Sequence, residues 1–159
     1  SWTEADYALA AEFLRSYPRS TMAGIREKLM AYFEPEELDA ALEKPLDSCI
    51  HPFNPKETGY NSGSTDVGDV GYATPTVMFH MAAACLGNVG HSWQNTAFAC
   101  SDIGMKGMLR AAEVLTLSTI RTMEQPQLLA KAKAELLQKN GGKYHCPLPD
   151  YVDPPIGRY

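Results

Sequence analysis

Residues 63–106 read GSTDVGDVGYATPTVMFHMAAACLGNVGHSWQNTAFACSDIGMK, and they join a Ser/Thr/Asp turn, a long apolar run and a His-Ser-Trp triplet. The central residues 76–81 are nearly continuously apolar, which is typical of a strand covered on both faces. Side chains that are able to bind a metal or a polar ligand stand on either side of this run. The stretch therefore predicts a buried strand with a candidate site at its ends, supported by the rest of the chain.

The flanking segments predict helices. Thr3 with an acidic residue three positions later resembles a capping box, and apolar residues at helical spacing continue until Pro18. Further helices are predicted from about residue 20, from Pro35, through Val70 after a cap at one of residues 64–66, from Ser101 or Asp102, and from residue 126. The methionine-rich stripe of the long helix, at 105, 108 and 123, is expected to face the core. Strand and helices together predict an α/β domain that is helix-rich at both ends.

Composition and charge favour a globular protein and argue against nucleic-acid and membrane partners. The chain has 159 residues, of which 45% are hydrophobic and 21% charged, so one globular domain is expected. A net charge of -5 without a Lys/Arg cluster argues against nucleic acid as a partner. The longest apolar run, 76–86, contains His80 and is too short to span a bilayer, so no membrane partner is expected. Residues 1–10 carry no basic segment of the kind that opens a signal peptide, and we expect a cytoplasmic protein.

The four cysteines, Cys49, Cys85, Cys100 and Cys146, form no CxxC pair. This favours four reduced thiols over a disulfide framework or a zinc-thiolate site. Cys100 with a histidine would be the elements of a nucleophile pair, but no orienting partner is suggested, and a cysteine hydrolase remains a minor alternative.

The candidate site residues have more than one interpretation each. His91 lies on a Gly/Asn-rich loop after the predicted strand, where it would bind a metal or a loop carbonyl. Asp66 and Asp69 are three apart, so on a helix they would share a face and would bind a metal, orient a ligand or cap the helix. Trp93 is either core packing or the wall of a pocket. The residues by themselves reach no further than an α/β domain with a possible ligand-bearing loop.

Three segments carry a resemblance to a known family: GSTDVGDVGYATPT, then GHSW, then GMKGMLRAAEVL. Together they resemble the C-terminal part of aminobenzoyl-glutamate hydrolases, within the dinuclear-metal amidohydrolases and exopeptidases that include carboxypeptidase G and aminoacylase. The opening WTEADYALA and the segment LLAKAKAELLQKNGGK are similar to other parts of that family's chain. The resemblance implies a zinc-exopeptidase-like domain with a mixed sheet flanked by helices, and two zinc or manganese ions that activate a bridging water for attack on an amide.

The resemblance also implies roles for individual residues. His91 matches a histidine that binds the metal pair. Ser64, Thr65 and Asp66 match a turn beside the active site, where they would contact substrate or support the metal ligands. Trp93 would help to wall the pocket. Lys106 matches a recurring position without an assigned role.

We therefore expect residues 1–159 to be the C-terminal segment of a catalytic domain, without the N-terminal half and the lid domain through which the full-length protein would form a homo-oligomer. The remaining metal ligands and the general-base glutamate would lie in those parts, so the isolated chain is expected to be inactive on a small-molecule amide such as an N-acyl amino acid. The alternative is a non-catalytic binding or assembly module, for which a closed core and a complete ligand set within this chain are expected.

Overall fold

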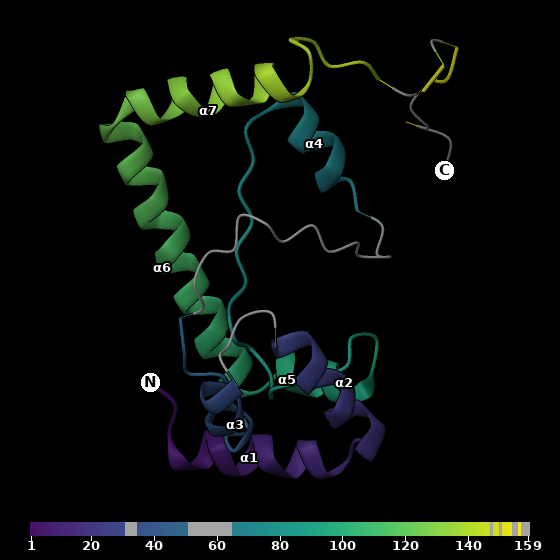
Figure 1. The fold of residues 1–159 in the computed structure, drawn as a ribbon, viewed down its shortest axis with the longest axis vertical. Coiled ribbons are helices and arrows are strands. Elements are labelled where there is room, and N and C mark those ends of the chain that lie inside the picture. Colours follow the sequence, from purple (N-terminus) through teal and green to yellow (C-terminus); the bar gives the residue numbers. More distant parts are fainter. Residues whose placement is uncertain (31–34, 51–64, 147, 150, 154–155, 157–159) are drawn as a thin grey trace. The chain divides into compact units, whose positions relative to one another are not determined.

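The computed structural model describes residues 1–30, 35–50, 65–146, 148–149, 151–153 and 156 (Figure 1). The described residues form seven helices: α1 (Glu4–Arg15), α2 (Arg19–Leu29), α3 (Pro35–Leu42), α4 (Val67–Ala73), α5 (Trp93–Ala99), α6 (Asp102–Glu124) and α7 (Pro126–Lys139). The chain divides into two compact units, and the boundary between them falls within α6. Unit 1 comprises Ser1–Tyr60 and Phe79–Ser118, and unit 2 comprises Asn61–Met78 and Thr119–Tyr159.

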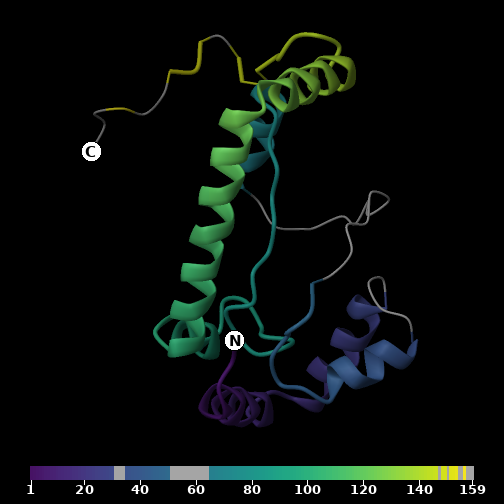
Figure 2. The same cartoon turned by 90° about the vertical axis from the view of Figure 1, so that its left-hand side faces the viewer.

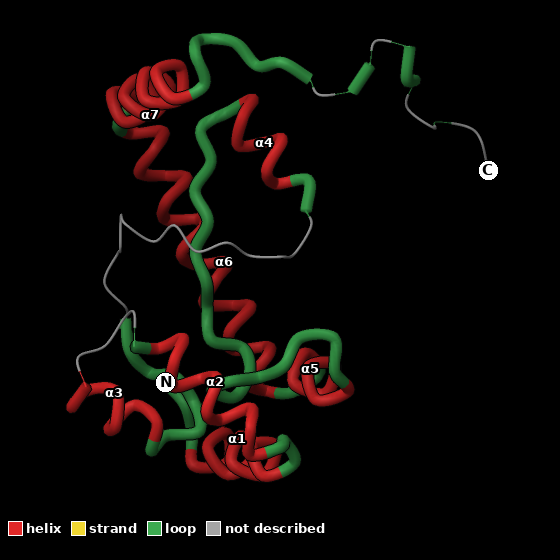
Figure 3. The backbone as a smooth tube through the Cα atoms, turned by 45° about the vertical axis from the view of Figure 1, so that its right-hand side comes forward, coloured by secondary structure: helices red, strands yellow, loops and turns green. Residues whose placement is uncertain are grey.

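The expectation of an α/β fold with a mixed sheet is wrong, because no strand occurs among the residues that the structure describes (Figure 3). Residues 76–81, expected as a buried strand, carry no regular secondary structure, and the side chains of Val77 and Met78 are 87% and 70% exposed. An extended segment becomes a strand only when a neighbour completes its backbone hydrogen bonds. The apolar run indicated a segment suited to burial, but it could not indicate whether a pairing neighbour was present.

Unit 1 has a small core between α1, α5 and the first turns of α6, which lie together in both ribbon views (Figures 1 and 2). Its fully enclosed side chains include Ala10 of α1, Phe98 of α5 and Ile103 of α6. The rings of Phe13 and Phe98 lie 4.5 Å apart between centroids, in a tilted arrangement favourable to aromatic pairs. Aromatic and aliphatic contacts thus join segments that are some 85 residues apart in sequence, as the pairing of 13 with 98 shows.

Helices α2 and α3, also in unit 1, pack against each other. Ile25 and Leu38 bury their side chains, and the exposed pair Arg26–Asp39 joins the two helices at 2.7 Å. Because both charged groups are at least half exposed, this ion pair contributes little to stability.

Close packing against α6 depends on a glycine. A Cβ atom added at Gly107 would lie 2.5 Å from the carbonyl oxygen of Ala82 and 2.8 Å from the Cβ of Ala83. The helix therefore approaches the 82–83 backbone more closely than any side chain allows. The Ser101 hydroxyl accepts a hydrogen bond from the amide of Gly104 at 3.3 Å, which confirms Ser101 as a cap of this helix.

The stripe expected to face the core is largely exposed. Met105, Met108 and Met123 are 44%, 58% and 77% exposed, and Leu129 and Leu137 of α7 are also exposed. The buried residues of α6 are instead Ile103, Gly104 and Gly107, and α7 has none among the described residues, so helical periodicity did not predict which positions are buried.

In unit 2, α4 and the C-terminus of α7 are joined by a hydrogen bond from Asn140 Nδ2 to the carbonyl oxygen of Tyr72, at 3.1 Å. The predicted short helix after Asp66 is present as α4. The predicted C-terminal signal of α7 is also confirmed, because Asn140 is its C-cap and both Gly141 and Gly142 have positive φ. Among the helices that the structure describes, none combines the length and apolarity needed to cross a bilayer.

Candidate functional site: the His91 loop

Residues 86–92, here called the His91 loop, leave the core at the buried Cys85 and lead into α5. The Leu86 amide donates to the carbonyl oxygen of Pro45 at 2.8 Å, and the Asn88 amide donates to that of Cys85 at 3.0 Å. Gly87 has φ of 78°, and a Cβ there would lie 1.7 Å from Ile25 Cδ1. Only glycine fits this position, which fixes the start of the loop against α2.

Side-chain hydrogen bonds hold the loop against the end of α1. The Tyr17 hydroxyl donates to Asn88 Oδ1 at 2.8 Å and accepts from the Val89 amide at 3.4 Å. Asn88 Nδ2 in turn donates to Asn95 Oδ1 of α5 at 2.6 Å. Since one tyrosine and one asparagine link α1, the loop and α5, the position of the loop depends on both.

His91 itself is the last residue before the cap of α5. Ser92 accepts a hydrogen bond from the Asn95 amide at 3.2 Å and donates from its hydroxyl to the Val89 carbonyl at 2.6 Å. His91 has φ of 56°, the one positive value among the described non-glycine residues, and its side chain is exposed. Such a backbone conformation is uncommon outside glycine and persists where the surrounding structure enforces it, often at functional sites.

Trp93 lies beside His91 at the start of α5. Its ring is 5.7 Å from that of Phe13 between centroids, and it remains 66% exposed. The next residue, Gln94, is buried and donates from Nε2 to the Ser16 hydroxyl at 3.2 Å. Trp93 therefore packs one part of its ring on α1 and leaves the rest beside the loop, in keeping with either interpretation given above.

The described residues do not make up a metal centre. No group of three or more His, Cys, Asp or Glu side chains able to hold a metal occurs in the part of the chain that the structure describes. His91 offers one imidazole donor, whereas a protein zinc site needs at least three ligands from the protein. A pair of divalent ions therefore does not fit these residues alone.

The acidic turn falls in the other unit. Ser64 lies outside the described residues. Thr65 accepts from the Val67 amide at 3.4 Å, and Asp66 is the N-cap of α4 but forms no side-chain capping bond. Thr65 and Asp66 belong to unit 2, whereas His91 and Trp93 lie close to each other in unit 1.

The alternative of a cysteine hydrolase needs a histidine within hydrogen-bond reach of the Cys100 thiol, and His91 does not meet this requirement. His91 precedes α5 and Cys100 is its C-cap, so the seven residues of the helix stand between them. Seven residues of α-helix span about 10 Å, which is beyond hydrogen-bond reach. Cys85, which is buried, has its pKa raised to about 11 by loss of water around the thiol, so it is a poor nucleophile.

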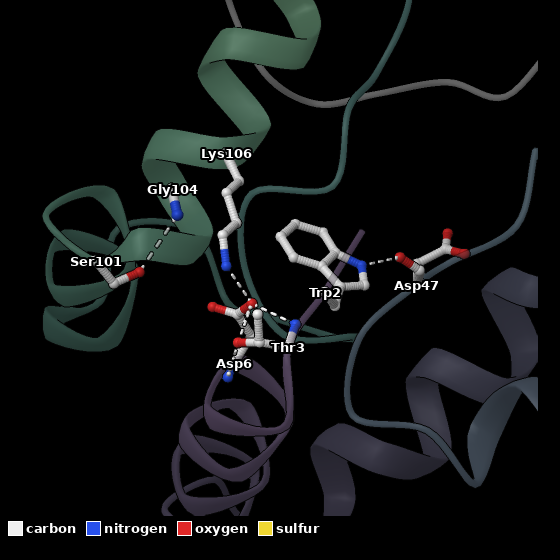
Figure 4. A network of polar contacts seen from close by, with 7 residues as sticks. All are labelled: Trp2, Thr3, Asp6, Asp47, Ser101, Gly104 and Lys106. Atoms are coloured by element: carbon white, nitrogen blue, oxygen red, sulfur yellow. Dashed lines mark hydrogen bonds and ion pairs between the residues drawn. The ribbon is translucent and has the colours of Figure 1, made fainter.

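Lys106 forms an ion pair that links α6 to the start of α1. Its ammonium pairs with the Asp6 carboxylate at 2.5 Å, and the same Oδ2 atom accepts from the Thr3 amide at 2.7 Å and the Thr3 hydroxyl at 2.8 Å (Figure 4). Next to this network, the Trp2 indole donates a hydrogen bond to the main-chain carbonyl oxygen of Asp47 at 2.9 Å. The bond from Lys106, followed by the backbone bond from Thr3, lowers the pKa of Asp6 to about 2. Lys106 thus fastens α6 to the predicted capping box of α1, which the structure confirms.

Sequence reasoning missed α5 and the contacts of Tyr17. Ser92 followed by residues that tolerate a helix was a local signal for α5, since serine is a preferred N-cap. No local signal existed for the bond between Tyr17 and Asn88, which are 71 residues apart.

Sequence comparison relates the chain to hydrolases. It is 33% identical over 94 residues to a protein of Escherichia coli (strain K12) that is named as one of the subunits of p-aminobenzoyl-glutamate hydrolase. The aligned region covers 58% of this chain and 20% of that protein, so the matched part of the chain spans about a fifth of the relative's length. No protein-family model matches the chain. No solved structure matches it either.

Proposed function

We propose that this chain is one portion of a metal-dependent amidohydrolase, which cleaves the amide bond of an aminobenzoyl-glutamate-like compound or another N-acyl amino acid. The observation that carries the proposal is the 33% identity to a protein named as part of an aminobenzoyl-glutamate hydrolase. The partner of the whole enzyme would be this small amide, with neither nucleic acid nor a membrane involved, and the site of action would be the cytoplasm.

In this proposal His91 donates one imidazole to a pair of zinc or manganese ions. The positive φ of His91 and the hydrogen bonds of Tyr17 and Ser92 support the assignment, because they fix the backbone of the loop that carries this exposed histidine. Bound metal ions would polarise the amide carbonyl and supply hydroxide at neutral pH. The other ligands and the general base would come from outside this chain.

The distribution of apolar side chains favours a portion over a self-sufficient binding module. Among the described residues, seven apolar side chains are buried, while 25 large ones are exposed. The exposed set includes several side chains of the long helix α6, such as Met105, Met108 and Leu109. Monomeric proteins seldom expose large contiguous apolar faces, so these faces are suited to burial by further protein. We propose that the rest of the hydrolase covers them and that the whole enzyme is a homo-oligomer.

The test compares the chain alone with the chain placed in its relative. Hydrolysis of aminobenzoyl-glutamate is measured for the isolated 159 residues with added Zn²⁺ or Mn²⁺, and for a chimera in which this chain replaces the matched segment of the Escherichia coli protein. The control is the same Escherichia coli protein with the matched segment deleted.

We expect no turnover from the isolated chain or from the deletion control, and metal-dependent turnover from the chimera. A folded chimera without activity would contradict the proposal. Robust turnover by the isolated chain would show instead that a complete site lies within it.

A further inference from the structure

Unit 2 contains a cavity that plays no part in the His91 loop. It has a volume of about 300 Å³ and is lined by Asp69, Tyr72, Asn140, Lys143, Tyr144 and His145. Cavities from this size upwards hold small-molecule ligands in proteins. We call it the α4–α7 cavity, since α4 provides Asp69 and Tyr72 and the turn after α7 provides the remaining residues.

Side chains of the turn that follows α7 contact α4. Asn140 donates from Nδ2 to the Tyr72 carbonyl at 3.1 Å, and its Oδ1 accepts from the Gly142 amide at 3.1 Å. Gly141 and Gly142 have φ of 70° and 87°, which side chains rarely allow. After these two glycines, Lys143, Tyr144 and His145 line the same cavity as Asp69 and Tyr72 of α4.

Charges of opposite sign line this cavity. Asp69 supplies a carboxylate and Lys143 an ammonium group, and the described residues include no ion-pair partner for Lys143. The Tyr144 hydroxyl lies near the carboxylate: its pKa is raised by loss of water and then by the negative charge of Asp69. A carboxylate has about four lone-pair positions, so Asp69 retains acceptor capacity beside this tyrosine.

The walls between these charges are aromatic. Tyr72 and Tyr144 both line the cavity, and more of its surface is apolar than polar. A ligand that satisfies every feature carries a cation for Asp69, an anion for Lys143 and a flat apolar group for the two phenol rings. A plain anion would face Asp69 and a plain cation would face Lys143, so each would meet repulsion.

We propose that the α4–α7 cavity binds an aromatic α-amino acid as its zwitterion. The ammonium group of the ligand pairs with Asp69, its carboxylate pairs with Lys143 and the neighbouring His145 imidazole, and its ring packs against Tyr72 and Tyr144. The proposal depends on unit 2 alone, and it stands or falls separately from amide hydrolysis.

The test is isothermal titration calorimetry of the 159-residue chain at pH 7 with four probes. Phenylalanine carries all three groups, hydrocinnamate lacks the ammonium, phenethylamine lacks the carboxylate, and alanine lacks the ring. We expect phenylalanine to bind most tightly. Hydrocinnamate and phenethylamine each lose one partly exposed ion pair and should bind up to about fivefold more weakly. Alanine loses the apolar contact of the ring and should bind at least about tenfold more weakly.

Matched variants locate the binding. Lys143→Met and Asp69→Asn are each expected to weaken phenylalanine binding about fivefold. Lys131→Met on α7 and Asp153→Asn, both at exposed positions away from the cavity lining, are expected to leave it unchanged. Circular dichroism verifies that each variant retains the helical content of the parent chain. Absence of phenylalanine binding, equal binding of phenylalanine and hydrocinnamate, or normal binding by the Lys143→Met variant would each overturn the proposal.

Discussion

Replacement of Asp6 by asparagine removes the charge on which the junction of α1 and α6 depends. Asp6 is 3% exposed, and one of its carboxylate oxygens accepts from Lys106 and from both the amide and the hydroxyl of Thr3. Asparagine keeps a carbonyl oxygen that can accept from Thr3, but it has no charge to attract the ammonium group. The change therefore isolates the electrostatic part of the junction.

The magnitude follows from the pKa of Asp6, which folding lowers from 3.8 to about 2. A shift of this size corresponds to about 2 kcal/mol of stability at neutral pH. Lys106 is 37% exposed, so water weakens the pair and we expect the Asp6→Asn change to cost about 1–2 kcal/mol at pH 7. Because the folded pKa lies below the unfolded one, this stability is complete above the unfolded pKa and is lost as the pH falls through the folded pKa. By pH 3 about half of it should remain.

The assay is urea-induced unfolding of the parent chain and the Asp6→Asn variant at pH 7 and pH 3, followed by circular dichroism. The control is Asp39→Asn, which breaks the exposed pair with Arg26 and should cost less than about 0.5 kcal/mol. The reasoning is refuted if the Asp6→Asn variant is as stable as the parent at pH 7. An equal loss at both pH values would also refute it, because the loss would then not come from the charge.

Three other outcomes follow from the packing. Gly107→Ala should destabilise the chain by about 1–3 kcal/mol in urea unfolding, because the new methyl group would overlap the Ala82 carbonyl. Tyr17→Phe should cost about 1 kcal/mol and speed amide hydrogen exchange in the His91 loop, because the hydroxyl bonds Asn88 there. Cys85 should resist iodoacetamide at pH 8 in the folded chain and react in urea, as mass spectrometry of the modified peptides would show, since burial raises its pKa to about 11.

Each of these outcomes has an internal control. Gly68→Ala adds a methyl group with no atom within 4 Å and should not destabilise the chain. Tyr151→Phe removes a hydroxyl from an 85% exposed side chain and should leave exchange in the loop unchanged. The exposed Cys100 should react with iodoacetamide in the folded chain. A tolerated Gly107→Ala, unaltered exchange in the Tyr17→Phe variant, or rapid modification of folded Cys85 would contradict the respective explanation.

Local signals in the sequence predicted most of the helices. The capping box at Thr3, the proline at the start of α3 and the Asn-Gly-Gly end of α7 are short-range features, because each is satisfied by atoms a few residues away. α6 was found from Ser101 and its apolar period for the same reason.

The strand over 76–81 failed because strand formation is decided by a neighbour and not by the segment itself. Lys106 could not be given a role from the sequence for a related reason: its partner Asp6 is 100 residues away, and no spacing rule connects the two. For the candidate site, the sequence singled out His91 and Trp93 as candidates, but the support of the His91 loop by Tyr17 and Asn88 required the tertiary structure. The site roles of His91 and Trp93, like those of Ser64, Thr65 and Asp66, stay predictions.

The most direct test of the proposed function is the effect of His91→Ala on aminobenzoyl-glutamate hydrolysis by the chimera with the Escherichia coli protein. His80→Ala, at another exposed histidine of unit 1, is the matched control. We expect His91→Ala to lower kcat/KM at least about a hundredfold and to reduce the bound metal, as loss of a ligand does, while His80→Ala leaves both unchanged. Parent-like activity and metal content in the His91→Ala chimera would contradict the account.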